Sequence, residues 1–213
     1  MIKAVIFDMD GVLADSEPLY LESINKILAD YRSHMTESEY KGILGETFEH
    51  SWDVIIQRYM LPHTRDYWLA KYDTVVEDTL SAKVQPSPGL YQLLGEINRR
   101  KLPKGLASSS KRIWVIAVLK TLRLENEFRV IITGEEAKNG KPHPEIFQTT
   151  ANLLDAAPRE CLVIEDSPVG IEAAKTAGAK VVALRTPYTA GMDLSRADRV
   201  IDSLAHFDYS LLD

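Results

Sequence analysis

Two aspartates separated by one residue, Asp8 and Asp10, directly follow a mostly apolar run at residues 2–6. The run has the composition of a buried strand, and alternate side chains of a strand point to the same side, so the two carboxylates should project together. Carboxylates this close repel each other unless a cation or a proton lies between them. Gly11 follows them and suits a chain that must adopt a positive φ on leaving a strand. The pattern predicts a cation-assisted site at the carboxyl end of this strand.

Taken alone, the same residues also fit a solvated turn, in which the carboxylates accept bonds from backbone N–H groups and glycine supplies the positive φ. A calcium loop would need further oxygen ligands at alternate positions, whereas Val12, Leu13 and Ala14 are apolar. The choice between turn and metal site therefore depends on whether later segments offer partners for a divalent cation and a phosphate.

Hydroxyl groups follow a second expected strand. Ser108 and Ser109 lie at its carboxyl end, where their hydroxyls and the N–H groups of the next helical turn could bind phosphate oxygens. Serines before a helix are usually N-caps, and this is the interpretation preferred for Ser110. Ser108 is the better candidate for a functional serine.

A lysine and two acids complete the set. Lys141 stands between Gly140 and Pro142, a rigid frame that would direct its charge toward one place. Glu165 and Asp166 end the apolar segment 161–164, and carboxylate oxygens are the ligands that Mg²⁺ prefers. Because acids now occur at two strand ends, an oxygen-lined magnesium site explains them better than a helix cap does.

Two regions of the chain differ in their sequence pattern. Residues 16 to about 83 carry only helical spacing, with aromatic stripes that are typical of the seams of a helical bundle. After the breaker at residues 86–89, apolar strands alternate with helices, which predicts a parallel sheet covered on both faces. The expected helices are 90–100, 111–121, 144–154 and 168–177, and the expected strands after the first are 105–108, 128–132, 161–164, 180–184 and 199–201. The fold class is therefore α/β, with a core of residues 1–15 and 86–213 and a helical insertion of residues 16–85.

Composition limits the function. The 213 residues carry a formal net charge of −6, which disfavours nucleic-acid binding. Hydrophobic residues make up 45% of the chain, which is ample for a packed core. The single Cys161 lies in an apolar run and is interpreted as a small core residue. No apolar run is long enough to cross a membrane, and the chain starts in a strand, so a cytoplasmic protein without membrane partners is expected.

With these segments quoted, the chain resembles the haloacid dehalogenase-like superfamily of phosphotransferases, in the branch with a helical cap after the first motif. The resemblance spans nearly the whole chain and rests on DMDGVLADSE at 8–17, ASSSK at 107–111, GKPHPEIF at 140–147 and VIEDSPVGIEAAKTAGA at 163–179. It implies a Rossmann-like core and a Mg²⁺ ion between the first and last motifs.

The resemblance also implies roles for single residues. Asp8 would be the nucleophile that takes up the phosphoryl group, Asp10 the general acid and then base, and Ser108 and Lys141 would hold the phosphate. Asp166 and Glu165 would bind Mg²⁺ together with the Asp8 carboxylate and the main-chain carbonyl of Asp10. A carboxylate can form a covalent phospho-intermediate, while a lysine and a metal neutralise the charge of the transferring group.

The same branch contains phosphatases for small phosphorylated metabolites and β-phosphoglucomutase. The cap segment 46–52 reads ETFEHSW, where the mutase shows an arginine, and residues 15–20 resemble those of the sugar-phosphate phosphatases. Hydrolysis is therefore expected, with a phosphomutase as the alternative and a non-catalytic phosphate-binding regulator as a distant third. The expected substrate-binding residues are Glu17, Thr47 and Phe48 in the cap and Ser109 in the core, and the protein is expected to be a monomer.

Overall fold

The computed structural model describes residues 1–43 and 48–213, which divide into two compact units. The sheet unit consists of Met1–Asp15 and Gln85–Asp213, and the helical unit consists of Ser16–Val84. The chain thus leaves the sheet unit after its first strand and returns at Gln85, one residue before the boundary that the sequence suggests. The helical unit is an insertion between the first and second strands.

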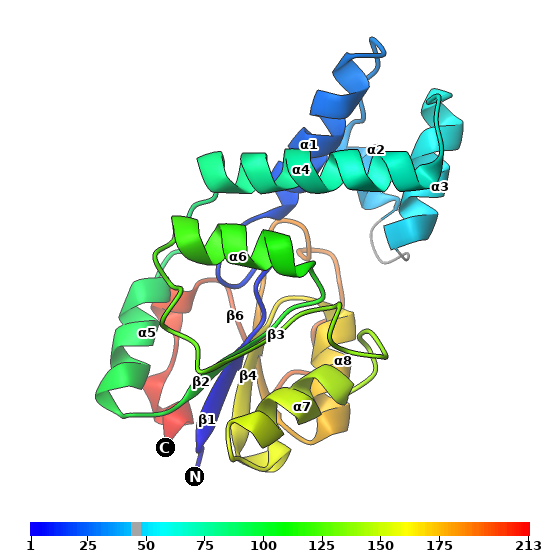
Figure 1. Ribbon diagram of the computed structural model, residues 1–213. Helices are drawn as coiled ribbons and strands as arrows, with labels where there is room; N and C mark the ends of the chain where they lie inside the picture. The colour runs from blue at the N-terminus through cyan, green and yellow to red at the C-terminus, as the bar shows by residue number, and fades with distance from the viewer. Residues whose placement is uncertain (44–47) are drawn as a thin grey trace. The chain divides into compact units, whose positions relative to one another are not determined.

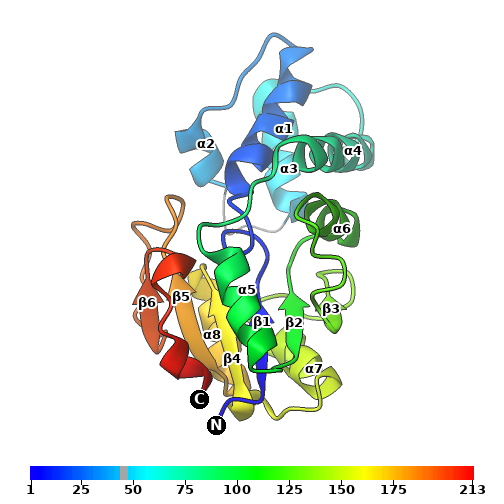
Figure 2. The same cartoon turned by 90° about the vertical axis from the view of Figure 1, so that its left-hand side faces the viewer.

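The sheet unit is built on a six-stranded sheet of order β3-β2-β1-β4-β5-β6, in which every pairing is parallel (Figures 1 and 2). This confirms the α/β fold class. The first strand, β1, has β2 on one side and β4 on the other, so residues that follow these three strands meet at one edge of the sheet. The strands are β1 (Ala4–Phe7), β2 (Lys104–Ala107), β3 (Val130–Ile132), β4 (Cys161–Glu165), β5 (Lys180–Leu184) and β6 (Arg199–Ile201).

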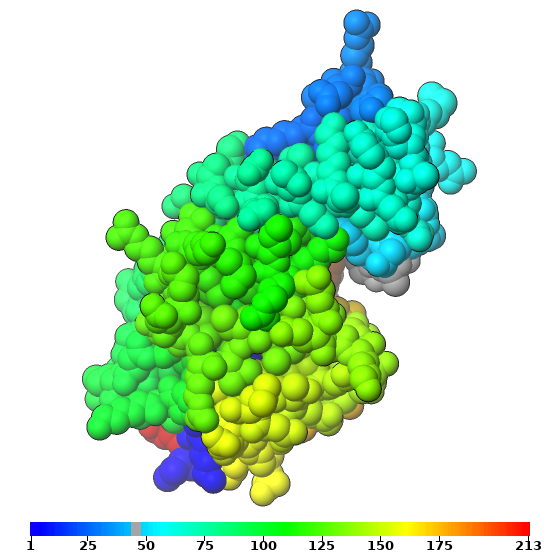
Figure 3. Space-filling model, viewed as in Figure 1, coloured from blue at the N-terminus to red at the C-terminus, as the bar shows by residue number. Residues whose placement is uncertain are grey.

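Helices cover the sheet. Helices α7 and α8 lie on one face, and α5 lies on the other with the C-terminal segment (Figures 1 and 2). In the space-filling view the green-to-yellow residues of the sheet unit cover most of the sheet (Figure 3). The helices of the sheet unit are α5 (Leu90–Arg99), α6 (Arg112–Thr121), α7 (Glu145–Leu153) and α8 (Pro168–Ala177), followed by short 3-10 turns at Leu204–His206 and Tyr209–Leu212.

Continuous apolar strands fit this two-sided cover. Ile6 and Val163 point to the α7–α8 side, where they pack with Phe147 and Ile171 in a buried cluster. Cys161 belongs to the same cluster and is fully buried, which confirms it as a core residue. Burial raises the pKa of its thiol to about 11, so the thiolate form is disfavoured.

Local sequence signals account for the ends of α8. Ser167 is its N-cap, and its hydroxyl accepts a bond from the N–H of Gly170, while Pro168 opens the first turn. Gly178 ends the helix with a φ of 95°. Helix α6 differs from expectation: its N-cap is Lys111, whose side chain makes no capping bond, and the N–H of Arg112 donates to the Glu135 carboxylate instead, so the interpretation of Ser110 as an N-cap is wrong.

The helical unit contains α1 (Glu17–Ala29), α2 (Glu37–Lys41), α3 (Phe48–Tyr59) and α4 (Arg65–Lys83). Its seam is aromatic, as the helical spacing predicts: the rings of Trp52 and Trp68 stack with centroids 6.5 Å apart, and both side chains are buried. Thr36 and Glu39 form a capping box at the start of α2. Within the described parts of the chain, no helix combines the length and the apolar character needed to span a membrane.

Candidate active site

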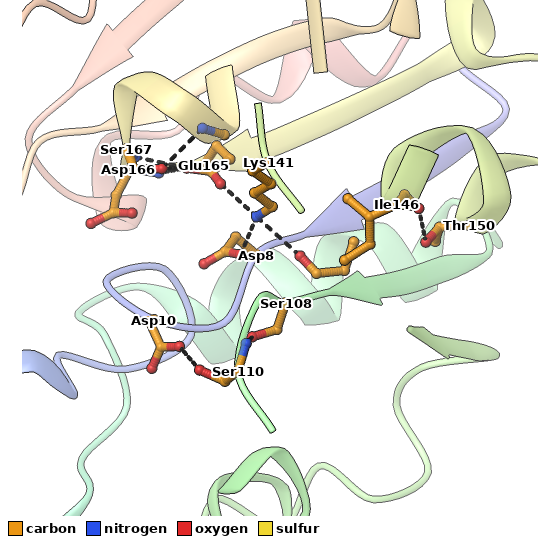
Figure 4. Close-up of polar contacts among 12 residues, drawn as sticks. Asp8, Asp10, Ser108, Ser110, Lys141, Ile146, Thr150, Glu165, Asp166 and Ser167 are labelled. Carbon is orange, nitrogen blue, oxygen red and sulfur yellow. Dashed lines mark hydrogen bonds and ion pairs between the residues drawn. The ribbon is translucent and has the colours of Figure 1, made fainter. Parts of the chain in front are cut away.

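The candidate site lies at the carboxyl ends of the three central strands. Asp8 follows β1, Ser108 follows β2, and Asp166 follows β4 (Figure 4). The register pairs Phe7 with both Leu106 and Ile164, so the next residue along β1, Asp8, comes level with the ends of both neighbours. Parallel pairing therefore gathers residues that are far apart in the sequence, as the switch-point rule for open α/β sheets predicts.

Lys141 is the centre of this cluster. Its Nζ lies 2.6 Å from Oδ1 of Asp8 and 2.7 Å from Oε1 of Glu165, and it donates a longer bond of 3.3 Å to the carbonyl oxygen of Ala107 (Figure 4). The ring of Phe147, on the first turns of α7, lies 4.9 Å from the same nitrogen. The Lys141 side chain is only 5% exposed, so its charge acts on these groups with little screening by water.

Glu145 ties down the loop that carries Lys141. The carboxylate of Glu145 accepts bonds from the backbone N–H groups of Lys138 and Asn139 and from the side-chain amide of Asn139. These bonds tie the loop to the start of α7 on the far side of Lys141. The lysine is therefore held in a defined position, as the expected rigid frame requires.

Burial dominates the electrostatics of Asp8. It raises the pKa of Asp8 to about 8, with Glu165 and Asp10 adding to the rise and Lys141 opposing it. Burial works to lower the pKa of Lys141, but the two carboxylates together raise it above its ordinary value. Lys141 is therefore firmly protonated, and a further positive charge near Asp8 would favour the ionised, nucleophilic carboxylate.

The Glu165 carboxylate faces Lys141 and its own loop. Oε1 contacts Lys141, while Oε2 accepts bonds of 2.7 Å from the N–H groups of Asp166 and Ser167 and one of 3.0 Å from the Ser167 hydroxyl. Both oxygens are thus engaged within the protein, and the side chain is 1% exposed. Metal ligation by Glu165 stays a prediction.

Asp166 and Gly11 approach each other closely. Gly11 has a φ of 73°, as the sequence suggests for the turn after β1, and a Cβ at this position would lie 2.1 Å from Oδ2 of Asp166. Glycine is therefore required twice, for the backbone conformation and for the space. The contact brings the Asp166 carboxylate onto the backbone of the loop that follows Asp8 and Asp10.

Asp10 is held by a serine in the segment that follows the neighbouring strand β2. The hydroxyl of Ser110 donates a bond of 2.5 Å to Oδ2 of Asp10, and the N–H of Ser110 donates to the hydroxyl oxygen of Ser108 at 3.1 Å (Figure 4). Ser108 is fully buried. The serine segment after β2 is thus joined to the aspartate segment after β1 through a side-chain contact.

These residues fit a divalent cation. The carboxylates of Asp8, Asp10 and Asp166 lie around one region of the loops in Figure 4. Asp8 and Glu165 are buried acids that share the buried ammonium of Lys141, so one negative charge of this pair remains uncompensated if both are ionised. Among the described residues, no group of three or more His, Cys, Asp or Glu side chains could hold a metal ion by itself. A set of two carboxylates and the main-chain carbonyl of Asp10 is compatible with this finding.

The expected substrate-binding residues come from both units. Glu17 and Phe48 lie in the helical unit, where Glu17 accepts a 2.7 Å bond from the Tyr40 hydroxyl and Phe48 packs 5.9 Å from the Tyr72 ring. Thr47 falls outside the described residues. Ser109 is exposed in the sheet unit beside Ser108. Their roles stay predictions.

Three residues were missed by sequence reasoning. Ser110 contacts Asp10, Phe147 lies beside Lys141, and Gly170 lies against Glu165. Ser110 and Phe147 can be seen in the sequence close to Ser108 and Lys141. A serine before a helix is usually an N-cap, however, and a phenylalanine in a helix is usually a core residue. The glycine in the first turns of α8 is the clearest signal, since glycine is a poor helix former.

The fold and the site define the class of protein as a parallel α/β enzyme whose acids and lysine meet at the carboxyl ends of the central strands. The chain belongs to the haloacid dehalogenase-like hydrolase family, whose model matches residues 5–184. It is a phosphoric monoester hydrolase of that family.

Three relatives illustrate the similarity. The phosphorylated carbohydrates phosphatase of Thermotoga maritima is 32% identical and covers 83% of this chain and 82% of its own length. β-Phosphoglucomutase of Bacillus subtilis is 29% identical over 99% of this chain and 94% of its own. The crystal structure of CbbY from Rhodobacter sphaeroides in complex with xylulose-1,5-bisphosphate has a TM-score of 0.89 at 25% identity, with 100% of both chains covered.

Proposed function

We propose that the protein is a Mg²⁺-dependent phosphatase that hydrolyses a small phosphorylated carbohydrate through an aspartyl-phosphate on Asp8. The observation that carries the proposal is the contact between Lys141 and Asp8, a buried ammonium 2.6 Å from the carboxylate that follows the central strand. An anionic phosphate ester would be repelled by Asp8 alone, and the lysine offsets that repulsion where the phosphoryl group must arrive.

The first step is a displacement at phosphorus. An oxygen of Asp8 attacks the phosphorus atom, an acyl phosphate bond forms, and the bond between phosphorus and the ester oxygen breaks. The leaving alkoxide takes a proton from the Asp10 carboxyl group, which Ser110 holds by its hydroxyl. Lys141 and the hydroxyl of Ser108 orient the transferring oxygens and neutralise part of their charge.

The second step regenerates the enzyme. Asp10, now ionised, accepts a proton from a water molecule as the oxygen of that water attacks the phosphorus atom. The bond between phosphorus and Asp8 breaks, inorganic phosphate leaves, and Asp10 again carries the proton for the next cycle. Splitting the reaction in this way lets one acid serve as general acid and then as general base.

The proposed Mg²⁺ would be held by the carboxylates of Asp8 and Asp166 and the main-chain carbonyl of Asp10, with Glu165 as a further candidate. When bound, it would neutralise charge on the phosphate oxygens and favour the ionised form of Asp8. The close approach of Asp166 to the backbone at Gly11 supports this ligand set, because it brings a carboxylate beside the loop that contains that carbonyl.

The substrate class follows from the relatives and from the inserted unit. A relative named as a phosphorylated carbohydrates phosphatase supports a sugar phosphate. The helical unit is proposed to be a cap that selects the substrate through Glu17, Thr47 and Phe48. The protein is further proposed to be cytoplasmic and monomeric.

Hydrolysis tests the proposal directly. We expect the purified protein to release inorganic phosphate from p-nitrophenyl phosphate and, faster, from members of a sugar-phosphate panel. Removal of divalent ions with EDTA should stop the release, and added Mg²⁺ should restore it. Turnover that continues unchanged in EDTA would contradict the metal-dependent mechanism.

A phosphomutase is the second candidate, because β-phosphoglucomutase is 29% identical over nearly the whole chain. The two activities differ in whether water or a second sugar hydroxyl receives the phosphoryl group. Incubation with β-glucose 1-phosphate and a bisphosphate primer separates them. Fast formation of glucose 6-phosphate without stoichiometric inorganic phosphate would favour the mutase.

The contact between Ser110 and Asp10 leads to a prediction about proton transfer. Ser110→Ala removes the hydroxyl that holds the Asp10 carboxyl group, so we expect kcat for a sugar phosphate to fall about tenfold, a fraction of what a general acid contributes. For p-nitrophenyl phosphate the loss should be smaller if phosphorylation of Asp8 limits the rate, since nitrophenolate leaves without a proton. Ser110→Thr, which keeps the hydroxyl, serves as the control. Equal losses for both substrates in rapid-quench measurements of the first step would contradict the assigned role.

A further inference from the structure

The backbone conformation of Gly170 does not require a glycine. This residue lies in the first turns of α8, and it is not among the described glycines with positive φ, which are Gly11, Gly89 and Gly178. Alanine is a better helix former than glycine, so helix propensity alone favours another residue here. The reason for glycine must lie in what the backbone approaches.

The space beside the Gly170 backbone is filled by an acid. A Cβ built on Gly170 would lie 1.6 Å from Oε1, 2.0 Å from Cδ and 2.6 Å from Oε2 of Glu165. These separations are far inside van der Waals contact, and they involve the whole carboxylate rather than one atom. Glu165 therefore occupies the place that a side chain at position 170 would take.

That carboxylate is one of the two that hold Lys141. Oε1 of Glu165 is the atom nearest to the missing Cβ and is also the atom 2.7 Å from Nζ of Lys141. We propose that Gly170 is a positioning residue, whose lack of a side chain lets Glu165 reach Lys141 and keeps the ammonium aligned with Asp8. The inference rests on the proposed function, because that function assigns Lys141 to the transferring phosphate.

A methyl group at position 170 should disturb the site more than the fold. The backbone of α8 is fixed by the Ser167 cap and by Pro168, so it is the Glu165 side chain that must move. Its carboxylate is the far end of a flexible chain and can rotate away. Lys141 then loses one of its two carboxylate partners and is free to shift from its place beside Asp8.

The experiment compares Gly170→Ala with Gly95→Ala. Gly95 is also helical, in α5, and a Cβ there meets nothing within 4 Å, so its substitution gains the same helix propensity without a collision. We expect Gly95→Ala to keep the wild-type kcat/KM for a phosphate ester. Gly170→Ala should lose about tenfold to a hundredfold in kcat/KM, the scale expected for misplacing a catalytic group by about 1 Å. Both variants should remain folded by circular dichroism.

Two further readouts separate positioning from a general structural effect. Inhibition by orthovanadate should weaken in Gly170→Ala alone, because Lys141 would bind this phosphate analogue. Glu165→Asp shortens the acid by one methylene and makes room for the alanine methyl group. In the double variant Gly170→Ala/Glu165→Asp, the loss should therefore be smaller than the product of the two single losses.

The outcomes are decisive. Equal kcat/KM in Gly170→Ala and Gly95→Ala, or single losses that multiply fully, would overturn the proposal. If Gly170→Ala does not fold, Glu165→Asp should restore folding in the double variant, and failure to do so would also overturn it. A wild-type protein without phosphatase activity, or an active Asp8→Asn variant, would refute the proposed function instead, so the two failures can be told apart.

Discussion

Asp8→Asn is expected to fold like the wild type and to lose about 10⁴-fold or more in kcat/KM for any phosphate ester, as removal of a covalent nucleophile typically does. An amide is a far weaker nucleophile than a carboxylate. The substitution keeps the shape of the side chain, and the amide oxygen can still accept the bond from Lys141. The loss should therefore reflect chemistry and not unfolding.

Phosphate release and thermal unfolding, measured side by side, check this prediction. Asp155→Asn is the matched control: it makes the same chemical change at an exposed aspartate that pairs with Arg129, and its positive φ of 59° suits asparagine as well. The control should keep wild-type activity. Incubation of the wild type with substrate followed by acid quench should also leave phosphate bound covalently to the protein, whereas Asp8→Asn should show none. Normal turnover by Asp8→Asn would contradict the mechanism.

The sequence was sufficient to predict the frame of the site. Asp8, Ser108 and Asp166 each follow a run of apolar residues, and parallel strands bring their carboxyl ends to one edge, so the pattern alone places the three together. The expected strands and helices of the sheet unit agree with the structure to within two residues at their ends. Short apolar strands separated by amphipathic helices leave few other arrangements of a parallel sheet.

The contacts that refine the site could not be predicted in the same way. The resemblance implies Mg²⁺ ligation by Glu165, but the sequence does not show that its oxygens contact Lys141 and the N–H groups of its own loop. Ser110 was interpreted as a helix cap because that is the common role of a serine before a helix, whereas its hydroxyl contacts Asp10 on another strand. The Ser110 error concerns the direction of a side chain, which here depends on a neighbour 100 residues away in the sequence rather than on local spacing. Metal ligation by Glu165 stays a prediction.

Substitution of Lys141 should affect both stability and activity, because one ammonium is shared by two buried carboxylates. In Lys141→Met, Asp8 and Glu165 would face each other without a cation between them, which we expect to destabilise the protein by about 3–5 kcal/mol, the typical cost of breaking a buried ion pair. Activity should fall by about 10³-fold, since the charge on the transferring phosphoryl group loses its main protein partner. Urea unfolding and kcat/KM are the two measurements.

Lys138→Met is the matched control, because it makes the same change at another lysine of this loop. Lys138 lies three residues before Lys141 with an exposed side chain, and it is its backbone N–H that donates a bond to Glu145, so the substitution should change neither stability nor activity. Added Mg²⁺ gives a further check, because a divalent cation beside Asp8 would replace part of the missing charge. The stability of Lys141→Met should therefore rise with Mg²⁺ concentration more than that of the wild type. A variant that keeps wild-type stability without Mg²⁺ would show that the buried carboxylates are not held by Lys141.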